Sequence, residues 1–410
     1  MNNAGKNALM VVALLLLAGA GIAGGAVLNG ALKANKVRTP VDEEVSQKTS
    51  DSVETSSSSS STSVQHAPII GVTGEGGRNG NLYRTGAALG KTFEVDSVTG
   101  TITSDFDDVF PYCDIREVSD AAGNVFVEIP KHYTRYTYNS SNYTFTTEIC
   151  EEQLEGFILN PIFTDGNGHE LESVKIGKYA ATGTAAKATS KSGQAHLTSV
   201  THEGMRDACA ANGEGYQMLD IWANKMLQDL FKIEFATTNS QTIMEGNVNG
   251  SKQNSGKCDS IGENKSGWDL TTGCMTYRGI ENLWGNIWQW LDGMTFSSRD
   301  VYVCYDPAEY GSGKTDSPYV KIGYKTNTAG DGNSNRHGFD PNNPFAQISA
   351  ECNGTDCENG GYWFDYAYTA NACPGVGGRY GNGSGAGLWA LDSNTLTYSY
   401  DNVGGRLLLR

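Results

Sequence analysis

Beyond Ala67 the chain consists of short runs of β-branched and aromatic residues, separated by glycine, asparagine and aspartate. Of the 410 residues, 51 are glycine and 10% are aromatic. So much glycine disfavours a helical protein, and so many aromatic residues disfavour a disordered chain. Alternating or β-rich runs mark candidate strands at 125–129, 131–138, 143–150 and 174–180. The sequence therefore predicts short strands and loops over most of this part.

Only one region has a helical pattern. A short helix is predicted between Thr201 and Asn212, closed by Gly213, and a second from about Tyr216 to Phe231. Two helices, short twisted strands and a long, loop-rich second half predict an α+β fold. The second helix has an apolar face, as expected for a helix that packs on a sheet. Its apolar residues are Met218, Leu219, Trp222, Met226, Leu227, Leu230 and Phe231.

A short segment, residues 1–7, precedes an apolar segment, residues 8–32, that carries no charge and is long enough to cross a bilayer as a helix. We expect a retained transmembrane anchor. A cleaved signal peptide and an apolar helix buried in an assembly are the alternatives. Gly21 and Gly25 stand four positions apart, a spacing that lets two membrane helices approach closely and allows a homo-oligomer.

Residues 33–66 are polar, with a serine-rich run at 56–63, and cannot bury enough apolar surface to fold. They predict a flexible linker. Lys33, Lys36 and Arg38 follow the apolar segment, and the positive-inside rule alone would keep the next domain in the cytoplasm. This bias is small and large domains can be translocated regardless of it, so we expect a surface-exposed domain.

Residues 67–410 contain no further linker, which predicts a single domain. The chain has 46 acidic and 30 basic residues, a formal net charge of -16, which disfavours nucleic acid as a partner because a basic patch would be needed. Nine cysteines occur, from Cys113 to Cys373, without the CxxC or Cys/His spacing of a structural zinc site. No metal or other cofactor is predicted.

The C-terminal tail, residues 360–410, alternates Gly, Trp and Leu with Tyr, Asn, Ser, Thr and Asp. The second set is typical of adaptable binding surfaces, because Tyr gives large contact area and Ser and Asn adapt their hydrogen bonds. The alternative is an ordinary set of strand and turn residues, and for Trp389 a framework role is an equal alternative. The predicted ligand-binding residues are Asp365, Tyr366, Tyr368, Thr369, Asn371, Tyr380, Asn382, Ser384, Trp389, Ser393, Asn394, Tyr398 and Tyr400.

Upstream of the tail lies a tryptophan strip, residues 277–294, with the sequence YRGIENLWGNIWQWLDGM. Its tryptophans Trp284, Trp288 and Trp290 could stack a sugar ring, or they could pack the core beneath a binding face. We expect the core role.

These residues resemble the formylglycine-generating-enzyme-like branch of the C-type lectin fold. The strip residues 279–293 resemble its GNVWEW segment, and residues 377–380 stand where that branch has an Arg-Gly-Gly-Ser-Trp turn. Residues 405–407 resemble its closing Gly-Phe-Arg-Leu, and 126–133 and 155–163 resemble its opening strands. The resemblance implies a C-type-lectin-like fold after the N-terminal apolar helix.

Within that branch the chain resembles receptor-binding proteins of phage tails and the variable proteins of diversity-generating retroelements. The resemblance covers most of residues 105–410 and implies a fixed frame that displays diversifiable residues. It implies a displayed protein that binds a protein or glycan receptor on a cell surface, itself held at a membrane or virion surface. The residues that resemble frame are Gly375, Gly377, Gly378, Gly387, Leu388, Gly405, Arg406 and Leu407.

The same fold also implies an alternative, a formylglycine-generating oxidase that uses a cysteine pair and copper. Cys352 and Cys357 form a C-x4-C pair, but they precede Gly377. In the enzymes the pair follows the turn that Gly377 resembles. We therefore expect a binding protein and no enzyme, with a structural surface or tail component as the third alternative.

Overall fold

The computed structural model describes residues 67–75, 82–324, 332–352, 363–365 and 370–410, all in the compact unit that begins at Val64. The expected N-terminal anchor and linker lie outside the described residues. Within the described ranges, no helix combines the length and the apolar character needed to cross a membrane.

The α+β class expected from the sequence, with its C-type-lectin-like fold, is wrong. The part of the chain that the structure describes is mostly β, with five sheets, 37% strand and 14% helix. The reason lies in the length of the apolar runs. Most of them span only two to nine residues before a glycine or asparagine turn, which is enough for a strand but not for a stable helix.

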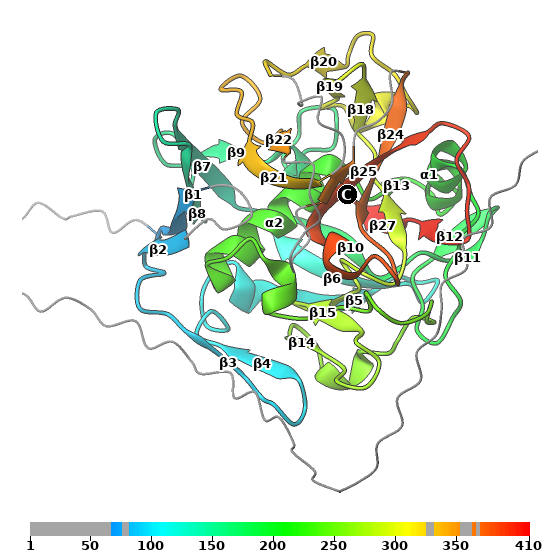
Figure 1. The fold of residues 1–410 in the computed structure, drawn as a ribbon, viewed down its shortest axis with the longest axis horizontal. Coiled ribbons are helices and arrows are strands. Elements are labelled where there is room, and N and C mark those ends of the chain that lie inside the picture. Colours follow the sequence, from blue (N-terminus) through cyan, green and yellow to red (C-terminus); the bar gives the residue numbers. More distant parts are fainter. Residues whose placement is uncertain (1–66, 76–81, 325–331, 353–362, 366–369) are drawn as a thin grey trace, which may run out of the picture. The chain divides into compact units, whose positions relative to one another are not determined.

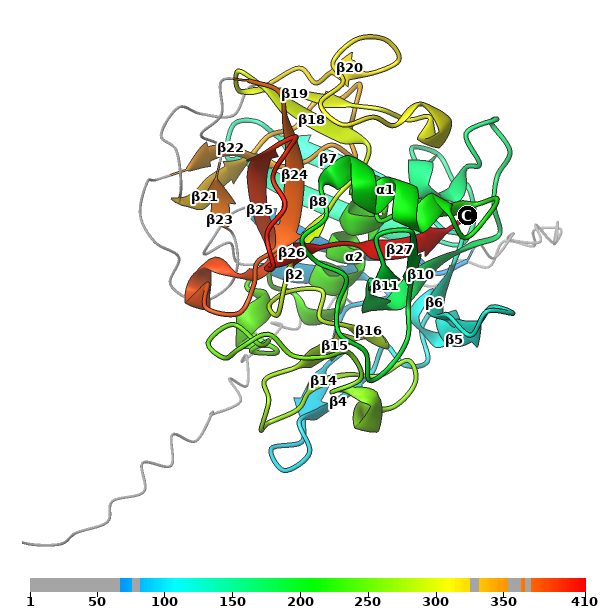
Figure 2. The same cartoon turned by 90° about the vertical axis from the view of Figure 1, so that its right-hand side faces the viewer.

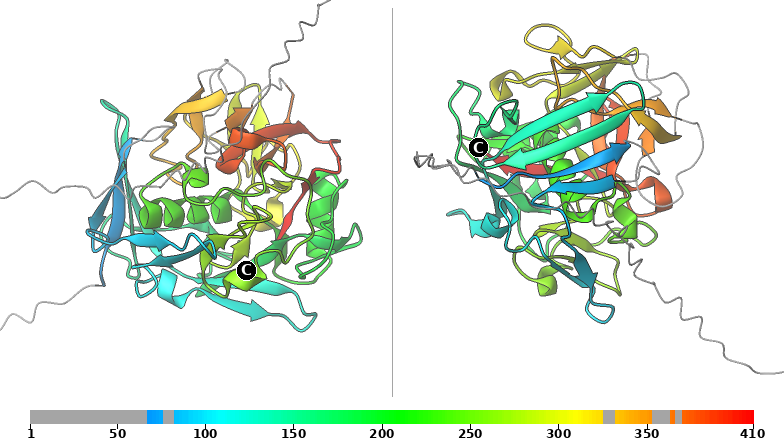
Figure 3. Two further views of the ribbon diagram at one scale, coloured as in Figure 1. Left: turned by 60° about the horizontal axis from the view of Figure 1, so that its bottom comes forward. Right: turned by 90° about the vertical axis from the view of Figure 1, so that its left-hand side faces the viewer.

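The first sheet is antiparallel and contains two of the predicted strands, 131–138 and 143–150 (Figure 3). Its strands, in spatial order, are β2 (Leu82–Gly86), β1 (Ile70–Glu75), β8 (Thr144–Cys150), β7 (Tyr133–Asn139) and β9 (Ile158–Leu159).

The second sheet joins distant parts of the sequence, because the last strand of the chain inserts between two earlier ones. Its order is β13 (Tyr216–Met218), β27 (Arg406–Leu409), β10 (Ser173–Ala180), β6 (Val125–Pro130) and β5 (Arg116–Ser119). The expected strands at 125–129 and 174–180 are confirmed here.

The third sheet lies in the lower part of Figure 1, and a small hairpin lies near α1. The third sheet runs β16 (Ile280–Glu281), β15 (Met275–Tyr277), β14 (Ser266–Trp268), β4 (Thr101–Ser104), β3 (Phe93–Val95). The hairpin is β11 (Thr182–Thr184) with β12 (Lys187–Thr189).

Among the described residues, the largest sheet has ten strands and contains all the strands of the tail except β27. Its main path is β20 (Val320–Lys321), β19 (Asp300–Val303), β18 (Met294–Ser297), β24 (Ala372–Gly377), β25 (Gly387–Thr395), β23 (Trp363–Asp365), β21 (Gly332–His337) and β22 (Ser349–Cys352). Off this path, β17 (Trp288–Trp290) pairs with β24 and with β26 (Val403–Gly404).

Two α-helices occur among the described residues. Helix α1 (His202–Ala210) confirms the first predicted helix, and the Thr201 side chain caps it by accepting from the Gly204 N–H. Helix α2 (Ile221–Phe235) begins later than predicted, because β13 occupies the expected first turn by pairing with β27, and the Asp220 side chain then caps the helix. Six 3₁₀ turns connect the elements: η1 (Tyr112–Asp114), η2 (Pro161–Phe163), η3 (Ser240–Thr242), η4 (Asp259–Ile261), η5 (Pro307–Glu309) and η6 (Gly383–Gly385).

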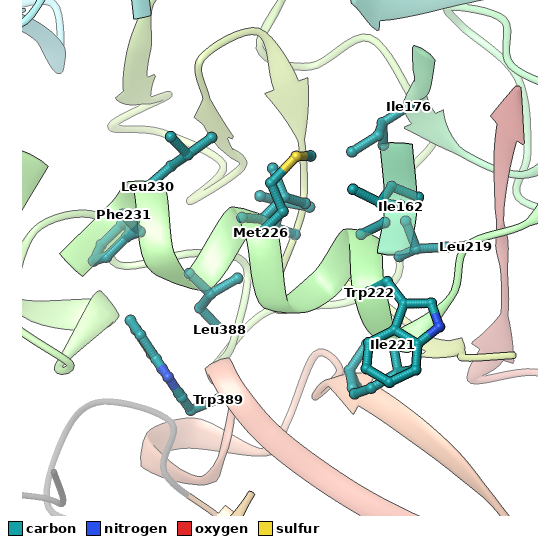
Figure 4. Close-up of a cluster of buried hydrophobic side chains, with 14 of the residues drawn as sticks. Ile162, Ile176, Leu219, Ile221, Trp222, Met226, Leu230, Phe231, Leu388 and Trp389 are labelled. Atoms are coloured by element: carbon teal, nitrogen blue, oxygen red, sulfur yellow. The ribbon is translucent and has the colours of Figure 1, made fainter. Parts of the chain in front are cut away.

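Helix α2 is the centre of the core rather than a surface helix with one apolar face. Nearly all its residues are buried, because sheets surround it (Figures 1 and 3). In Figure 4, Leu388 and Trp389 of the tail lie on one side of the helix, and Ile162 and Ile176 lie on another. The tail is therefore part of the main core and is not an appendage to it.

Candidate functional site

The tail forms an antiparallel hairpin of β24 and β25 inside the largest sheet (Figure 2). The pairing runs from Ala372 opposite Thr395 to Gly377 opposite Gly387. Strand β18 pairs with β24 on one side and β23 pairs with β25 on the other. Because both strands have neighbours, the hairpin is a fixed support for the two loops that it carries, residues 378–386 and 396–402.

Two glycines make the first of these loops. Gly377 has φ +88°, and a Cβ there would lie 2.6 Å from the Leu283 carbonyl oxygen. Gly378 has φ +75°, and its Cβ would lie 2.6 Å from the Ala386 Cα. Both the left-handed backbone and the close approach require glycine, which agrees with the frame role expected for these positions.

The other end of the tail is fixed by Arg406, whose side chain is fully buried. Its guanidinium donates to the Gly177 and Lys178 carbonyls of β10 at 2.7 and 2.9 Å. It also donates to the Glu281 and Asn282 carbonyls at 2.6 and 3.2 Å. A fifth bond, at 2.8 Å, reaches the side-chain oxygen of Gln289. Arg406 thereby joins β27, β10 and the tryptophan strip.

The tryptophan strip packs in the core, as expected. Trp284 and Trp290 are fully buried and Trp288 is 8% exposed. The Trp290 indole N–H donates to the Val200 carbonyl at 3.1 Å, and the Trp284 indole N–H donates to the Glu245 carbonyl at 3.3 Å. A sugar could not reach these rings without displacing the core, so they support the hairpin from below.

The predicted binding residues fall into three groups. Asn371 and Tyr400 are exposed, and Tyr380, Asn382, Ser384 and Tyr398 are partly buried. A second group is buried: Trp389, Ser393 and Asn394. For the third group the structure gives no side-chain position, because Tyr366, Tyr368 and Thr369 lie outside the described residues and Asp365 is described only as backbone of β23.

The buried group belongs to the framework of the hairpin. Trp389 packs its ring edge against Phe231 of α2, with ring centroids 5.7 Å apart. Asn394 donates to the Asp392 side chain at 3.1 Å, and Ser393 is 1% exposed. We therefore leave these three residues out of the proposed binding surface. The sequence pattern could not separate them from the exposed positions, because strand residues of both faces share one composition in this tail.

The accessible residues lie at opposite ends of the hairpin. Tyr380, Asn382 and Ser384 lie on loop 378–386. The Tyr380 N–H donates a hydrogen bond to the Asn286 carbonyl at 3.1 Å, which fixes this loop to the tryptophan strip. Asn382 itself accepts from the Arg379 N–H at 2.8 Å, so its side chain closes the turn. This loop offers mainly Tyr380 to a ligand.

The other end carries what we call the tyrosine face: Asn371, Leu396, Tyr398 and Tyr400. Leu396 is 39% and Tyr400 60% exposed, and the Tyr398 and Tyr400 rings lie 4.7 Å apart. The Asn371 side chain donates to the Gly313 carbonyl at 2.7 Å, and a Cβ at Gly313 would lie 2.8 Å from Leu396 Cδ2. Leu396 was missed from the sequence, although a leucine between Thr395 and Thr397 in a polar run was a usable signal.

The loop of the tyrosine face is held at its backbone. The Ser199 N–H donates to the Tyr400 carbonyl at 2.9 Å, and the Trp288 N–H donates to the Asn402 carbonyl at 2.9 Å. Burial raises the pKa of the Tyr398 hydroxyl and Asp392 adds to that shift, while a hydrogen bond from the Asn402 side chain opposes it. Tyr398 is therefore a neutral hydroxyl at physiological pH, able to donate and accept.

No protein-family model matches this chain, and a search of curated proteins finds no match either. The relationship read from the sequence motifs thus stays a prediction.

Proposed function

We propose that this chain is a displayed ligand-binding protein and that the tyrosine face is the centre of its binding surface. One observation supports this most: exposed Tyr400 and Leu396 stand beside Tyr398 on a loop whose backbone is fixed to the core. Large apolar residues on the surface of a rigid scaffold are typical of contact residues, because little conformational entropy is lost when they bind.

The chemistry of the face favours a protein or glycan receptor. Tyrosine rings pack against apolar groups and sugar rings, and their hydroxyls hydrogen-bond with amides and sugar hydroxyls. The net charge of -16 disfavours a polyanion as the ligand. The apolar residues 8–32 and the polar residues 33–66 would hold this surface away from a membrane or a virion; this part of the proposal rests on the sequence alone.

The first test replaces Tyr398 and Tyr400 with alanine. If these side chains are contact residues, each substitution weakens binding by about 30-fold or more, which corresponds to roughly 2 kcal/mol. Binding is measured with the labelled full chain on arrays of glycans and of cell-surface proteins, and then on cells that carry the receptor found. The thermal midpoint is followed in parallel and should change little for Tyr400→Ala, since that ring is exposed.

The matched control is Tyr83→Ala, because Tyr83 is 63% exposed but lies on β2, in the first sheet. It should leave binding unchanged. Equal loss of binding in the control, or loss that follows unfolding in every variant, would contradict the proposed surface.

A second test concerns the diversification that the resemblance implies. We expect the DNA next to the gene to hold a near-copy of the segment that encodes residues 360–410, differing only at adenines, beside a reverse transcriptase gene. Sequencing the locus checks this. A unique tail-coding segment would remove diversification from the proposal while leaving the binding surface intact.

A further inference from the structure

The loop-rich part of the chain before the tryptophan strip contains a cluster of three potential metal ligands. The Sγ atoms of Cys258 and Cys274 and a carboxylate oxygen of Glu281 lie within 4.8 Å of one another. All three residues are buried, Glu281 with 1% of its surface exposed. We infer that these residues bind a thiophilic metal ion of the zinc class, an activity independent of the proposed receptor binding.

Each ligand comes from a different element, so the fold rather than local spacing assembles the site. Cys258 immediately precedes η4, Cys274 ends the turn that joins β14 to β15, and Glu281 lies in β16. The turn is closed by the Asp269 N–H donating to the Cys274 carbonyl at 2.8 Å. No sequence motif marks this site, because the two cysteines are too far apart for a CxxC pattern.

The carboxylate is held in place by the backbone. Its two oxygens accept from the Gly256 and Cys258 N–H groups, each at 3.1 Å. A positioned carboxylate beside two thiols is a donor set suited to zinc, which takes cysteine and carboxylate ligands in tetrahedral sites and accepts water as a fourth ligand.

The weak apolar packing around the cluster also favours stabilisation by a cross-link. The local hydrophobic cluster has three members, Cys258, Ile261 and Cys274, and two of these are the thiols. The surrounding segment, residues 246–274, is rich in glycine, serine and asparagine. Where so little apolar surface is buried, small folded regions gain stability from a metal ion or a disulfide.

A disulfide between Cys258 and Cys274 is the competing cross-link. It would leave Glu281 as a buried carboxylate that accepts from two backbone N–H groups and whose charge Arg406 offsets only in part, and burying an incompletely compensated charge is costly. A bound cation would balance that charge and use all three side chains. The third donor therefore favours a metal ion over a disulfide.

The test uses the purified full chain, stripped of metal under reducing conditions and titrated with Co²⁺ and then Zn²⁺. We expect one equivalent to bind, with the thiolate-to-cobalt absorption band, and Zn²⁺ to displace Co²⁺. Cys258→Ser and Cys274→Ser should lose the band, and Glu281→Gln should weaken Zn²⁺ binding. The matched control is Cys209→Ser, a buried cysteine of α1 outside the cluster, which should keep the band.

A second measurement does not depend on variants. In the native wild-type chain, bound Zn²⁺ should protect Cys258 and Cys274 from alkylation, as read by peptide mass mapping, and chelation should expose them. A Cys258–Cys274 disulfide in the purified chain, or two free thiols that take up no metal, would overturn the inference.

Discussion

Replacing Arg406 with methionine is expected to lower the free energy of unfolding by about 4 kcal/mol or more, and it could prevent folding altogether. The substitution removes five hydrogen bonds from a fully buried guanidinium. Four backbone carbonyls then lose a donor in a site closed to water, and each unsatisfied buried group costs about 1–3 kcal/mol. Partial relaxation of the structure keeps the total loss of stability below the sum of these costs.

Arg406 forms no ion pair within 4.0 Å among the described residues, so carbonyl dipoles hold most of its charge, and the Glu281 carboxylate adds a weaker attraction. Burial lowers its pKa to about 9, and the guanidinium remains charged at neutral pH. Lysine should rescue only part of the stability, since one ammonium cannot reach β10 and the tryptophan strip together as a guanidinium fork does.

The measurement is urea unfolding of the wild type and variants at neutral pH. The matched control is Arg116→Met, whose side chain is 71% exposed although it is paired with Glu128, and which should change stability by less than about 1 kcal/mol. An Arg406→Met protein as stable as this control would show that the buried network contributes little.

A second large effect is expected in mild acid, where His132 and His196 together should lower the free energy of unfolding by about 4 kcal/mol between pH 6.5 and 4.5. His202 and His337, whose pKa values burial also lowers, add to this loss. Burial lowers the pKa of His132 and of His196 to about 4 in the folded protein. The unfolded chain protonates both near pH 6.5. Between these values the unfolded state binds more protons, so stability is lost as pH falls, at about 1.4 kcal/mol per histidine per pH unit.

The contacts of these histidines support neutral rings. His196 Nδ1 lies 3.1 Å from the Ala180 carbonyl, and its Nε2 lies 3.0 Å from the Asn286 amide nitrogen. Donation to the carbonyl at one nitrogen and acceptance from the amide at the other requires the neutral tautomer. His132 lies 3.0 Å from the Pro130 carbonyl and packs edge-on against Phe163.

Urea unfolding at several pH values tests this expectation. His132→Gln should reduce the loss by about 2 kcal/mol, the share of one histidine, whereas His169→Gln should leave it nearly unchanged, because the His169 side chain is 79% exposed. Comparing each variant with the wild type isolates the histidine contribution, since glutamate and aspartate begin to titrate near the lower end of this window. Constant stability across the window would show that the buried histidines take up protons in the folded state as readily as in the unfolded chain.

The sequence by itself determined the local elements of this protein. Alternation predicted β6, β7, β8 and β10, helical spacing predicted α1 and most of α2, and three tryptophans in one strip predicted core packing. These patterns depend on residues only a few positions apart, so they can be read directly from the sequence. The expected α+β class is wrong, because the strands of five sheets far outnumber the two helices among the described residues.

Only the tertiary structure decided which side chains face outward and which distant residues meet. Trp389, Ser393 and Asn394 belong to the same alternating sequence pattern as Tyr398 and Tyr400. Pairing of β25 with β24 and packing against α2 bury the first three residues. Local backbone geometry makes the side chains of a strand alternate between its two faces. Which face is buried depends on contacts with residues far away in the sequence.

The same reason applies to β27, to Arg406 and to the thiol cluster. β27 pairs with β13 and β10, strands that lie far from it in sequence, and this brings Arg406 to β10. Cys258, Cys274 and Glu281 converge only because the loops before the tryptophan strip fold back onto β16. Side-chain chemistry was present in the sequence, but its position in space was a property of the whole fold.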